Sequence, residues 1–261
     1  MPKIQVNGLE MNYSEFGSDN EGTPIVLVHG LGSQAKWFEP LANYLAINCN
    51  SHVFAIDLPG FGLSDKPETE SYSISSFVKY IAAWLDAVNL DKVIILGHSL
   101  GGMIAQLLAK EHSSRVEKMI LLCAATYLRA SGIELAMGKL LSLKATAAVV
   151  MKRAFPKDYP KEKIDETIKE VVANTSKSIY LKSLMAMTKK NFDSTAWLPE
   201  LRVPTLIIGS ENDRSLGYDM SKVLSEKIPG SVLYTIRNGN HEAETLHTEE
   251  VGTAIGKFIT S

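Results

Sequence analysis

Residues 94–102 read Ile-Ile-Leu-Gly-His-Ser-Leu-Gly-Gly and carry an apolar run into a serine that stands between glycines. The apolar run is typical of a buried strand, and the residues that follow continue with helical spacing. A sharp strand-to-helix turn at Ser99 would strain its backbone, and the small residues Gly97 and Gly101 would relieve the crowding around it. Such a turn lifts a serine hydroxyl above the edge of a sheet, where it can be aimed as a nucleophile. Because this spacing of glycines and serine also arises by chance, the rest of the chain decides its interpretation.

Apolar runs alternate with helical patterns on both sides of this stretch, which predicts a mostly parallel central sheet flanked by helices. The runs are short and continuous, as expected for strands that are covered on both faces. Asn7-Gly8 is a strong hairpin signal and predicts an antiparallel pair of strands near the N-terminus. The predicted core strands are Ile25–His29, His52–Ile56, Val93–Leu96, Lys118–Leu122, Thr205–Ile208 and Val232–Ile236.

Three stretches have apolar residues at helical spacing. Ile74–Val88 presents one apolar face and predicts a helix that covers the sheet. Gly102–Glu111 continues as a helix after the serine, and Val251–Phe258 forms a third helical stripe near the C-terminus. The chain therefore has the α/β pattern of a sheet with helices packed on it.

The region from Thr126 to Trp197 breaks this alternation, because it shows only helical patterns rich in Leu, Met, Ala and Lys. At roughly 70 residues it is too long for a connection between strands of a compact domain. We expect an inserted helical cap over residues 126–197, with a core formed by residues 1–125 and 198–261. Extra helices packed directly on the sheet are the alternative.

The composition excludes several classes of protein. Apolar residues make up 45% and charged residues 21% of the 261-residue chain, as in ordinary soluble domains. A formal net charge of -2 gives no basic field for nucleic acid, and neither a Lys/Arg run nor a long apolar stretch indicates a membrane partner. The first residues lack the apolar core of a signal peptide, and Cys49 and Cys123 are far apart. These features predict a reduced, cytoplasmic protein without a disulfide or a cysteine metal site, and they leave a homodimer open.

The Ser99 motif, together with "VLVHGLG" at residues 26–32 and "DLPGFGLSD" at residues 57–65, resembles the α/β-hydrolase family. The resemblance extends from the first hairpin to the last helix. It implies an α/β-hydrolase fold with a helical cap and a carboxylesterase-like serine hydrolase, but it does not specify a substrate, since this family supports many reactions. Within "DLPGFGLSD", Asp57 and Asp65 are expected to hold turns rather than to react.

A serine nucleophile needs a base, and the chain has six histidines. The family order of nucleophile, acid and histidine implies His241, which follows the predicted strand Val232–Ile236. His247 is a less favoured alternative. His98 is expected to point away from Ser99, and His29 is expected to brace the neighbouring glycine loop through hydrogen bonds.

An acid is needed to orient the histidine. The segment "GSENDRSLG" at residues 209–217 follows the strand Thr205–Ile208, where the resemblance implies the acid. The family's usual spacing falls on Asn212, so Asp213 requires a bulge of one residue in the loop. Glu211 remains an alternative, and Asp193 a remote one.

The resemblance also implies an oxyanion hole formed by the backbone amides of Leu31 and Leu100, with Gly30 and Gly32 allowing a close approach of the loop. Trp37 and Tyr127 are candidate walls of the substrate pocket. Apolar residues of the cap are expected to form mostly its own core, with some lining the cleft: Met137, Leu140, Leu141, Met151, Phe155, Met185 and Met187.

These residues predict a serine hydrolase that cleaves small to medium apolar carboxylic esters through an acyl-enzyme on Ser99, without a metal or organic cofactor. A lactonase or a carbon–carbon bond hydrolase would use the same three side chains. A ligand-binding receptor on this fold is a further alternative, and slow or absent turnover would distinguish it. A small-molecule ester or lactone is the expected partner.

Overall fold

The computed structural model of the chain describes residues 2–261 and contains one sheet of eight strands. The strand order is β1-β2-β4-β3-β5-β6-β7-β8. β2 pairs antiparallel with β1 and β4, and every other pair is parallel. The strands are β1 Lys3–Val6, β2 Leu9–Phe16, β3 Ile25–Val28, β4 Val53–Ile56, β5 Val93–His98, β6 Val116–Leu122, β7 Thr205–Ser210 and β8 Val232–Ile236. The predicted mostly parallel sheet is confirmed.

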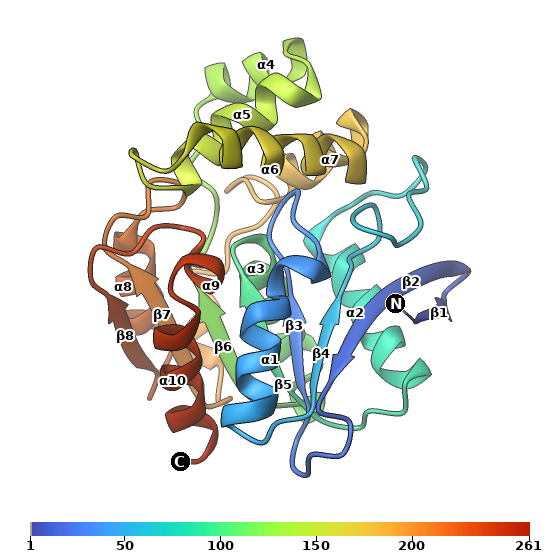
Figure 1. The fold of residues 1–261 in the computed structure, drawn as a ribbon, viewed down its shortest axis with the longest axis vertical. Helices are drawn as coiled ribbons and strands as arrows, with labels where there is room; N and C mark the ends of the chain where they lie inside the picture. The colour runs from blue at the N-terminus through green and yellow to red at the C-terminus, as the bar shows by residue number, and fades with distance from the viewer. Residues whose placement is uncertain (1) are drawn as a thin grey trace.

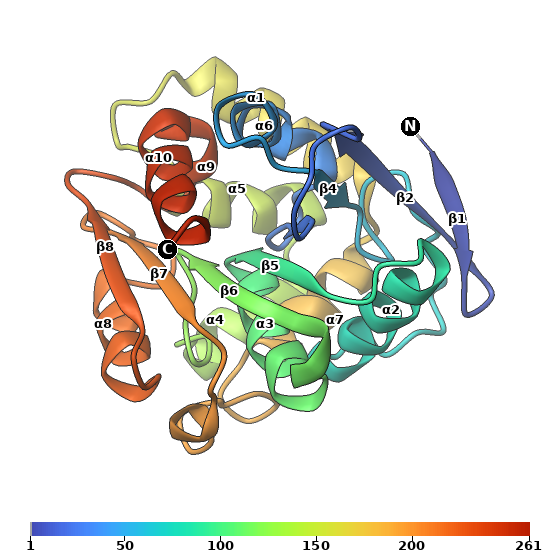
Figure 2. The same ribbon diagram turned by 90° about the horizontal axis from the view of Figure 1, so that it is seen from below.

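Helices cover both faces of the sheet, as Figures 1 and 2 show. One face carries α1 (Glu39–Asn48), α9 (Ala243–Leu246) and α10 (Thr248–Ile259). The other carries α2 (Ile74–Ala87), α3 (Leu100–Glu111) and α8 (Tyr218–Lys227). Short 3-10 turns at Ala35–Phe38, Ser113–Arg115 and Leu198–Glu200 complete the connections.

The apolar runs of the central strands are explained by this double coverage. In β5, Val93 and Ile95 pack in the core beneath α2 and α3, whereas Ile94 and Leu96 pack in the core beneath α1 and α10. Successive side chains of a strand point to opposite faces, so a strand with helices on both sides needs apolar residues at every position.

The N-terminal hairpin turns where the sequence predicts it. Asn7 and Gly8 both have positive φ, 49° and 83°, and Val6 pairs with Leu9 across the turn. Two successive positive φ angles match the right-handed twist of the flanking strands, and asparagine followed by glycine adopts them most readily.

The region between β6 and β7 is helical and lies above the carboxyl ends of the strands (Figure 1). It contains α4 (Gly132–Leu140), α5 (Leu143–Ala154), α6 (Lys161–Asn174) and α7 (Lys177–Ala186). Serine side chains begin three of these helices by accepting backbone N–H groups of the first turn: Ser131, Ser142 and Ser176. We refer to residues 126–197 as the cap.

Within residues 2–261, none of the helices combines the length and the apolar character that crossing a bilayer requires. Cys49 and Cys123 are both unpaired thiols.

Candidate active site

Ser99 stands at the turn between β5 and α3 with a strained backbone, φ 54° and ψ -113°. Glycine is the only residue that fits at two positions beside this turn, 97 and 101. A Cβ at Gly97 would lie 2.1 Å from the carbonyl oxygen of Gly101, and a Cβ at Gly101 would lie 2.1 Å from that of Val28. Because real Cβ atoms do not approach so closely, both glycines are required for β5 to turn directly into α3.

The turn presents the serine hydroxyl to a histidine and an aspartate from the loops that follow β8 and β7. His241 Nε2 lies 2.9 Å from Ser99 Oγ, and His241 Nδ1 lies 2.8 Å from Asp213 Oδ2. All three side chains are buried. Since the aspartate can only accept, the hydrogen-bond network places the ring proton on Nδ1 and leaves Nε2 free to accept from the serine.

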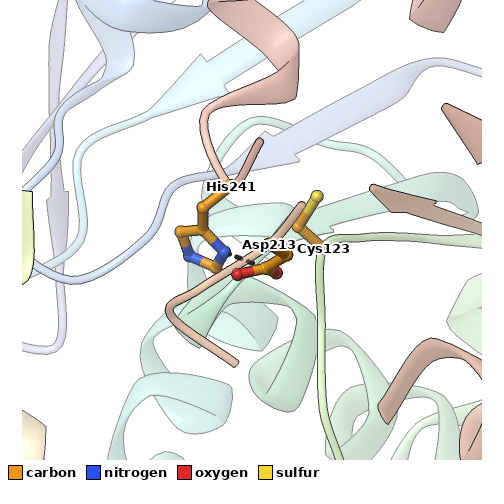
Figure 3. Close-up of side chains that lie close together, drawn as sticks. All are labelled: Cys123, Asp213 and His241. Atoms are coloured by element: carbon orange, nitrogen blue, oxygen red, sulfur yellow. Dashed lines mark hydrogen bonds and ion pairs between the residues drawn. The ribbon is translucent and has the colours of Figure 1, made fainter. Parts of the chain in front are cut away.

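Asp213 lies in the loop after β7, and Figure 3 shows its contact with His241. Its Oδ1 accepts the backbone N–H groups of Ser215 and Leu216, at 2.8 and 3.1 Å. Asn212, the residue at the usual spacing, instead donates its backbone N–H to the carbonyl of Gly239. The loop thereby directs the carboxylate of the next residue, Asp213, to His241.

The alternative acids lie elsewhere. Glu211 is exposed and accepts the backbone N–H of Asn238. Asp193 accepts the backbone N–H of Thr195 at the end of the cap. Neither carboxylate is therefore placed to orient His241.

The other histidines of the motifs have structural partners. His29 Nδ1 lies 2.7 Å from the carbonyl oxygen of Gly30, and its Nε2 accepts the backbone N–H of Leu58, so it braces the glycine loop. His247 is partly exposed and lies 3.7 Å from Glu250. His98 directs Nε2 to the carbonyl oxygen of His241, 3.0 Å away, and not to the serine hydroxyl.

The amides expected to form the oxyanion hole are available. Leu100 is the first residue of α3, where an N–H group has no partner within the helix. In the described chain, the N–H of Leu31 likewise donates to no protein acceptor. Leu31 follows Gly30, where an added Cβ would lie 3.2 Å from Ser99 Cβ. Both amides thus belong to backbone that adjoins the serine.

Charge around His241 raises its affinity for a proton. Burial alone would lower the pKa of His241, but Asp213, with smaller contributions from Glu242 and Glu244, outweighs burial and raises it to about 9. Burial would raise the pKa of Asp213, yet the histidine and the two backbone N–H donors lower it. The lowered pKa keeps Asp213 ionised, and the negative charge of Asp213 stabilises an imidazolium at His241.

Cys123 follows β6 and lies beside Asp213 (Figure 3). Burial raises the pKa of its thiol well above the usual value, so the thiol is protonated at neutral pH. The three groups lie within 4.8 Å of one another, and each already has a partner in the protein, because Asp213 and His241 are hydrogen-bonded to each other and Cys123 Sγ lies 3.4 Å from Ser210 Oγ.

A second buried cluster lies behind His241 and was not singled out from the sequence. It comprises His98, Glu242 and Glu244, and a ring nitrogen of the histidine and one carboxylate oxygen of each glutamate lie within 4.8 Å of one another. His98 Nδ1 lies 3.1 Å from Glu244 Oε1. Burial lowers the pKa of His98 to about 4. Burial and the repulsion from Glu244 raise the pKa of Glu242 to about 7. Burial also raises the pKa of Glu244 to about 7. The signal in the sequence was two acidic residues within three positions after the candidate base.

A cavity of about 280 Å³ lies above Ser99, between the sheet edge and the cap. Trp37 lines it as expected, and its Nε1–H also donates to Glu170 of α6 at 2.7 Å. Tyr127 does not line the cavity. Residues of an extended segment alternate in direction, so Leu128 faces the cavity while the Tyr127 ring lies under the Lys189 ammonium, 4.8 Å away.

The apolar cap residues divide between the cavity, the cap core and solvent. Met137, Leu141, Met151 and Met187 line the cavity, whereas Phe155 is buried without lining it. The expectation that most of the seven form the cap's own core is wrong, because four of them line the cavity and Leu140 is 85% exposed.

Comparison with known proteins agrees with this architecture. The family model for the alpha/beta hydrolase fold matches residues 23–244. The 2-hydroxy-6-oxo-2,4-heptadienoate hydrolase of Pseudomonas putida is 24% identical over 249 residues, which cover 91% of this chain and 88% of that protein.

Solved structures have the same fold. The enol-lactonase from Burkholderia xenovorans LB400 superposes with a TM-score of 0.89 at 23% identity and covers all of both chains. An esterase from Exiguobacterium antarcticum superposes with a TM-score of 0.87 at 23% identity and covers 99% of each chain. From the sheet, the serine turn and the match over residues 23–244, the chain belongs to the α/β-hydrolase fold family and is a hydrolase.

Proposed function

We propose that this hydrolase cleaves small to medium apolar carboxylic esters through an acyl-enzyme on Ser99. The observation that carries the proposal is the unbroken row from Ser99 Oγ through the His241 ring to Asp213, at 2.9 and 2.8 Å, beneath a cavity. A serine hydroxyl becomes a nucleophile when an adjacent base accepts its proton and a third group fixes the base.

In the first half of the reaction, Ser99 Oγ attacks the ester carbonyl carbon while its proton moves to His241 Nε2. The carbonyl oxygen becomes an oxyanion, which the N–H groups of Leu31 and Leu100 stabilise, aided by the N-terminal end of the α3 dipole. When the carbon–oxygen bond to the alcohol breaks, His241 gives its proton to the departing alkoxide. The alcohol leaves and the acyl group remains on Ser99.

In the second half, His241 accepts a proton from a water molecule, whose oxygen attacks the acyl carbon. The same amides hold the second oxyanion. Collapse of this intermediate releases the carboxylic acid, and His241 returns the proton to Ser99 Oγ. The two half-reactions leave the protein unchanged and require no other reactant.

The cavity favours an uncharged, apolar substrate. Among the described residues that line it, Arg129 and Arg153 are the cationic side chains whose charge does not depend on pH. Arg129 is paired with Asp219, and Arg153 is paired with Glu134 at 3.0 Å. Glu242 lines the cavity as well. A substrate carboxylate would therefore meet an acidic group and no unpaired arginine, which supports an ester over an anionic dienoate.

Initial rates on p-nitrophenyl esters from acetate to dodecanoate test the proposal. We expect rapid, repeated turnover with an optimum at an intermediate chain length, and a covalent adduct on Ser99 after treatment with an activated phosphonate. The Ser99→Ala variant should show neither. Absence of ester turnover with rapid opening of a lactone would assign a lactonase. Turnover of neither, with a ligand-induced rise in melting temperature, would assign a receptor and contradict the proposal.

A further inference from the structure

Helix α4 has an apolar outer face that no other described part of the chain covers. Ile133, Met137 and Leu140 are 75%, 51% and 85% exposed, and their spacing of four and three residues places them on one side of the helix. Leu135 and Gly138 of the same helix line the cavity. A helix that is apolar on two faces is normally buried on both. Figure 1 shows α4 as the outermost element of the cap, with α5 between it and the sheet.

The half of the cap that carries α4 is also strongly basic. Residues 126–157 contain six Lys and Arg against one Asp or Glu, a formal charge of +5, whereas residues 158–197 contain seven against six. The rest of the chain contains 14 Lys and Arg against 22 Asp and Glu, a formal charge of -8. Lys139, Lys144 and Lys152 are exposed on α4 and α5. The overall charge of -2 conceals this separation.

The exposed apolar surface continues into the cavity. Met137 and Val149 are both exposed to solvent and also line the cavity above Ser99. A molecule that entered beside these two residues would contact apolar side chains from the surface of the cap to the cavity.

We propose that α4 docks the cap on an anionic lipid–water interface, with Ile133 and Leu140 inserted among the acyl chains and the lysines of α4 and α5 near the headgroups. Apolar residues flanked by lysines are the pattern that binds the surface of an anionic bilayer. A second copy of the chain fits less well, because docking two such faces would bring two formal charges of +5 together. The role of the cavity in this proposal rests on the proposed function. If the protein is an esterase, the substrate ester would pass from the lipid layer through the cavity to Ser99. The total charge predicted no membrane partner, because it sums the basic half of the cap with the acidic remainder of the chain.

Co-sedimentation with lipid vesicles tests the docking independently of catalysis. The Ser99→Ala protein is mixed with vesicles of pure phosphatidylcholine, or of equal parts phosphatidylcholine and phosphatidylglycerol. We expect binding to the mixed vesicles and little to the pure ones. The doubly substituted Ile133→Ser/Leu140→Ser protein should bind the mixed vesicles at least about tenfold more weakly, since each aliphatic side chain gains its transfer energy on insertion.

Two further variants separate the components. Lys139→Gln and Lys144→Gln should each weaken binding to the anionic vesicles about fivefold, and the losses should shrink as salt is added. Val172→Ser, which replaces an exposed apolar residue on α6, is the matched control and should bind as the parent does. All of these side chains lie outside the cavity lining. Circular dichroism checks folding, and the same substitutions made in the protein that retains Ser99 should leave hydrolysis of soluble p-nitrophenyl butyrate unchanged.

The outcomes separate this proposal from the proposed function. Failure to bind the mixed vesicles, or equal binding by the doubly substituted protein, overturns the docking. Equal binding to both kinds of vesicle, insensitive to the lysine variants, overturns its anionic character. Sedimentation velocity that shows a dimer dissolved by Ile133→Ser/Leu140→Ser would assign the face to a second copy instead. Absence of butyrate hydrolysis in the wild-type protein would reject the esterase while the vesicle result stands.

Discussion

At the carboxyl ends of β5, β7 and β8, hydrogen bonds fix Ser99, Asp213 and His241, and each of these side chains is buried. In the cap, apolar side chains of α4 and α5 line the cavity, and two of them, Met137 and Val149, are exposed. The two regions face each other across the cavity. Replacing one of these polar side chains at the sheet edge removes a proton donor or acceptor from the hydrogen-bonded series Ser99–His241–Asp213. Changing an apolar residue in the cap alters only shape and contact area. We therefore expect substitutions at the edge to change rates by orders of magnitude, and substitutions in the cap to change preference.

The largest effect is expected at the nucleophile. Ser99→Ala should lower kcat by about 10⁶-fold, as removal of a serine nucleophile does in another serine hydrolase. The melting temperature should change little, because the strained turn depends on Gly97 and Gly101 rather than on the hydroxyl. Stopped assays at high enzyme concentration measure the residual rate. Full ester hydrolysis by a correctly folded variant would show that the edge does not supply the nucleophile.

The acid should come next. Asp213→Asn is expected to lower kcat by about 10⁴-fold, because the amide N–H can donate a hydrogen bond to Nδ1 and stabilise the wrong tautomer of His241. Glu211→Gln, two residues earlier in the same loop, is the matched control and should leave the rate near normal. A large loss in Glu211→Gln and a small one in Asp213→Asn would reverse the assignment of the acid.

The same contrast explains what the sequence could predict. The strands and the turn at Ser99 follow from short-range rules, namely apolar runs and glycine at crowded positions, whereas the expected place of the acid was implied by the resemblance to the α/β-hydrolase family. Even the one-residue displacement from Asn212 to Asp213 was predictable, because the backbone of a loop can absorb it. These features depend on a few neighbouring residues.

The features that sequence reasoning missed depend on contacts between distant segments. Leu128 and Tyr127 differ only in which way one residue of an extended segment faces, and Leu128 pairs with Thr188, sixty residues along the chain. The burial of Glu242 and Glu244 against His98 joins the end of β5 to α9. Apolar residues on α4 have the same spacing whether the helix is covered or exposed, so periodicity could not distinguish core from surface.

A smaller effect is expected from the acidic pair behind His241. General-base catalysis needs neutral His241, and its raised pKa means that the rate is lost as pH falls through a value above 6.5. Glu242→Gln removes a charge that favours the imidazolium, so the acidic limb of kcat/KM should move to lower pH. Because the pKa of Glu242 is about 7, this charge is present in mildly alkaline solution, and at about pH 8 its removal should raise the relative rate by up to about tenfold for a shift of one pH unit.

Profiles of kcat/KM from acidic to mildly alkaline pH measure the limb. Glu249→Gln, an exposed carboxylate on α10, is the control and should leave the limb in place. A merely structural role for Glu242 would lower the melting temperature without moving the limb. An unchanged limb in Glu242→Gln would show that the cluster does not act on His241.

The smallest effect is expected at the hydrogen bond between Trp37, near the sheet edge, and Glu170 of the cap. Trp37 follows the glycine loop of the sheet edge and donates to Glu170 on α6, while Gln34 donates to the same carboxylate at 3.2 Å. Trp37→Phe keeps most of the apolar ring and removes one N–H donor, which should cost about 1 kcal/mol and lower Tm by about 2–4 °C. Because Ser99 and Asp213 do not contact Trp37 through hydrogen bonds, kcat on a short ester should stay within about twofold, while KM for long acyl chains rises as the cap loosens.

Glu170→Gln sharpens this last test, because its amide oxygen can still accept the Trp37 N–H. If the hydrogen bond matters more than the charge, Glu170→Gln should retain most of the stability and the long-chain KM that Trp37→Phe loses. Equal losses of stability and of long-chain affinity in the two variants would show that the charge of Glu170 maintains this contact. A fall in kcat on the short ester would mean that the cap also positions the glycine loop, and the division between an edge that sets the rate and a cap that sets the preference would fail at Trp37.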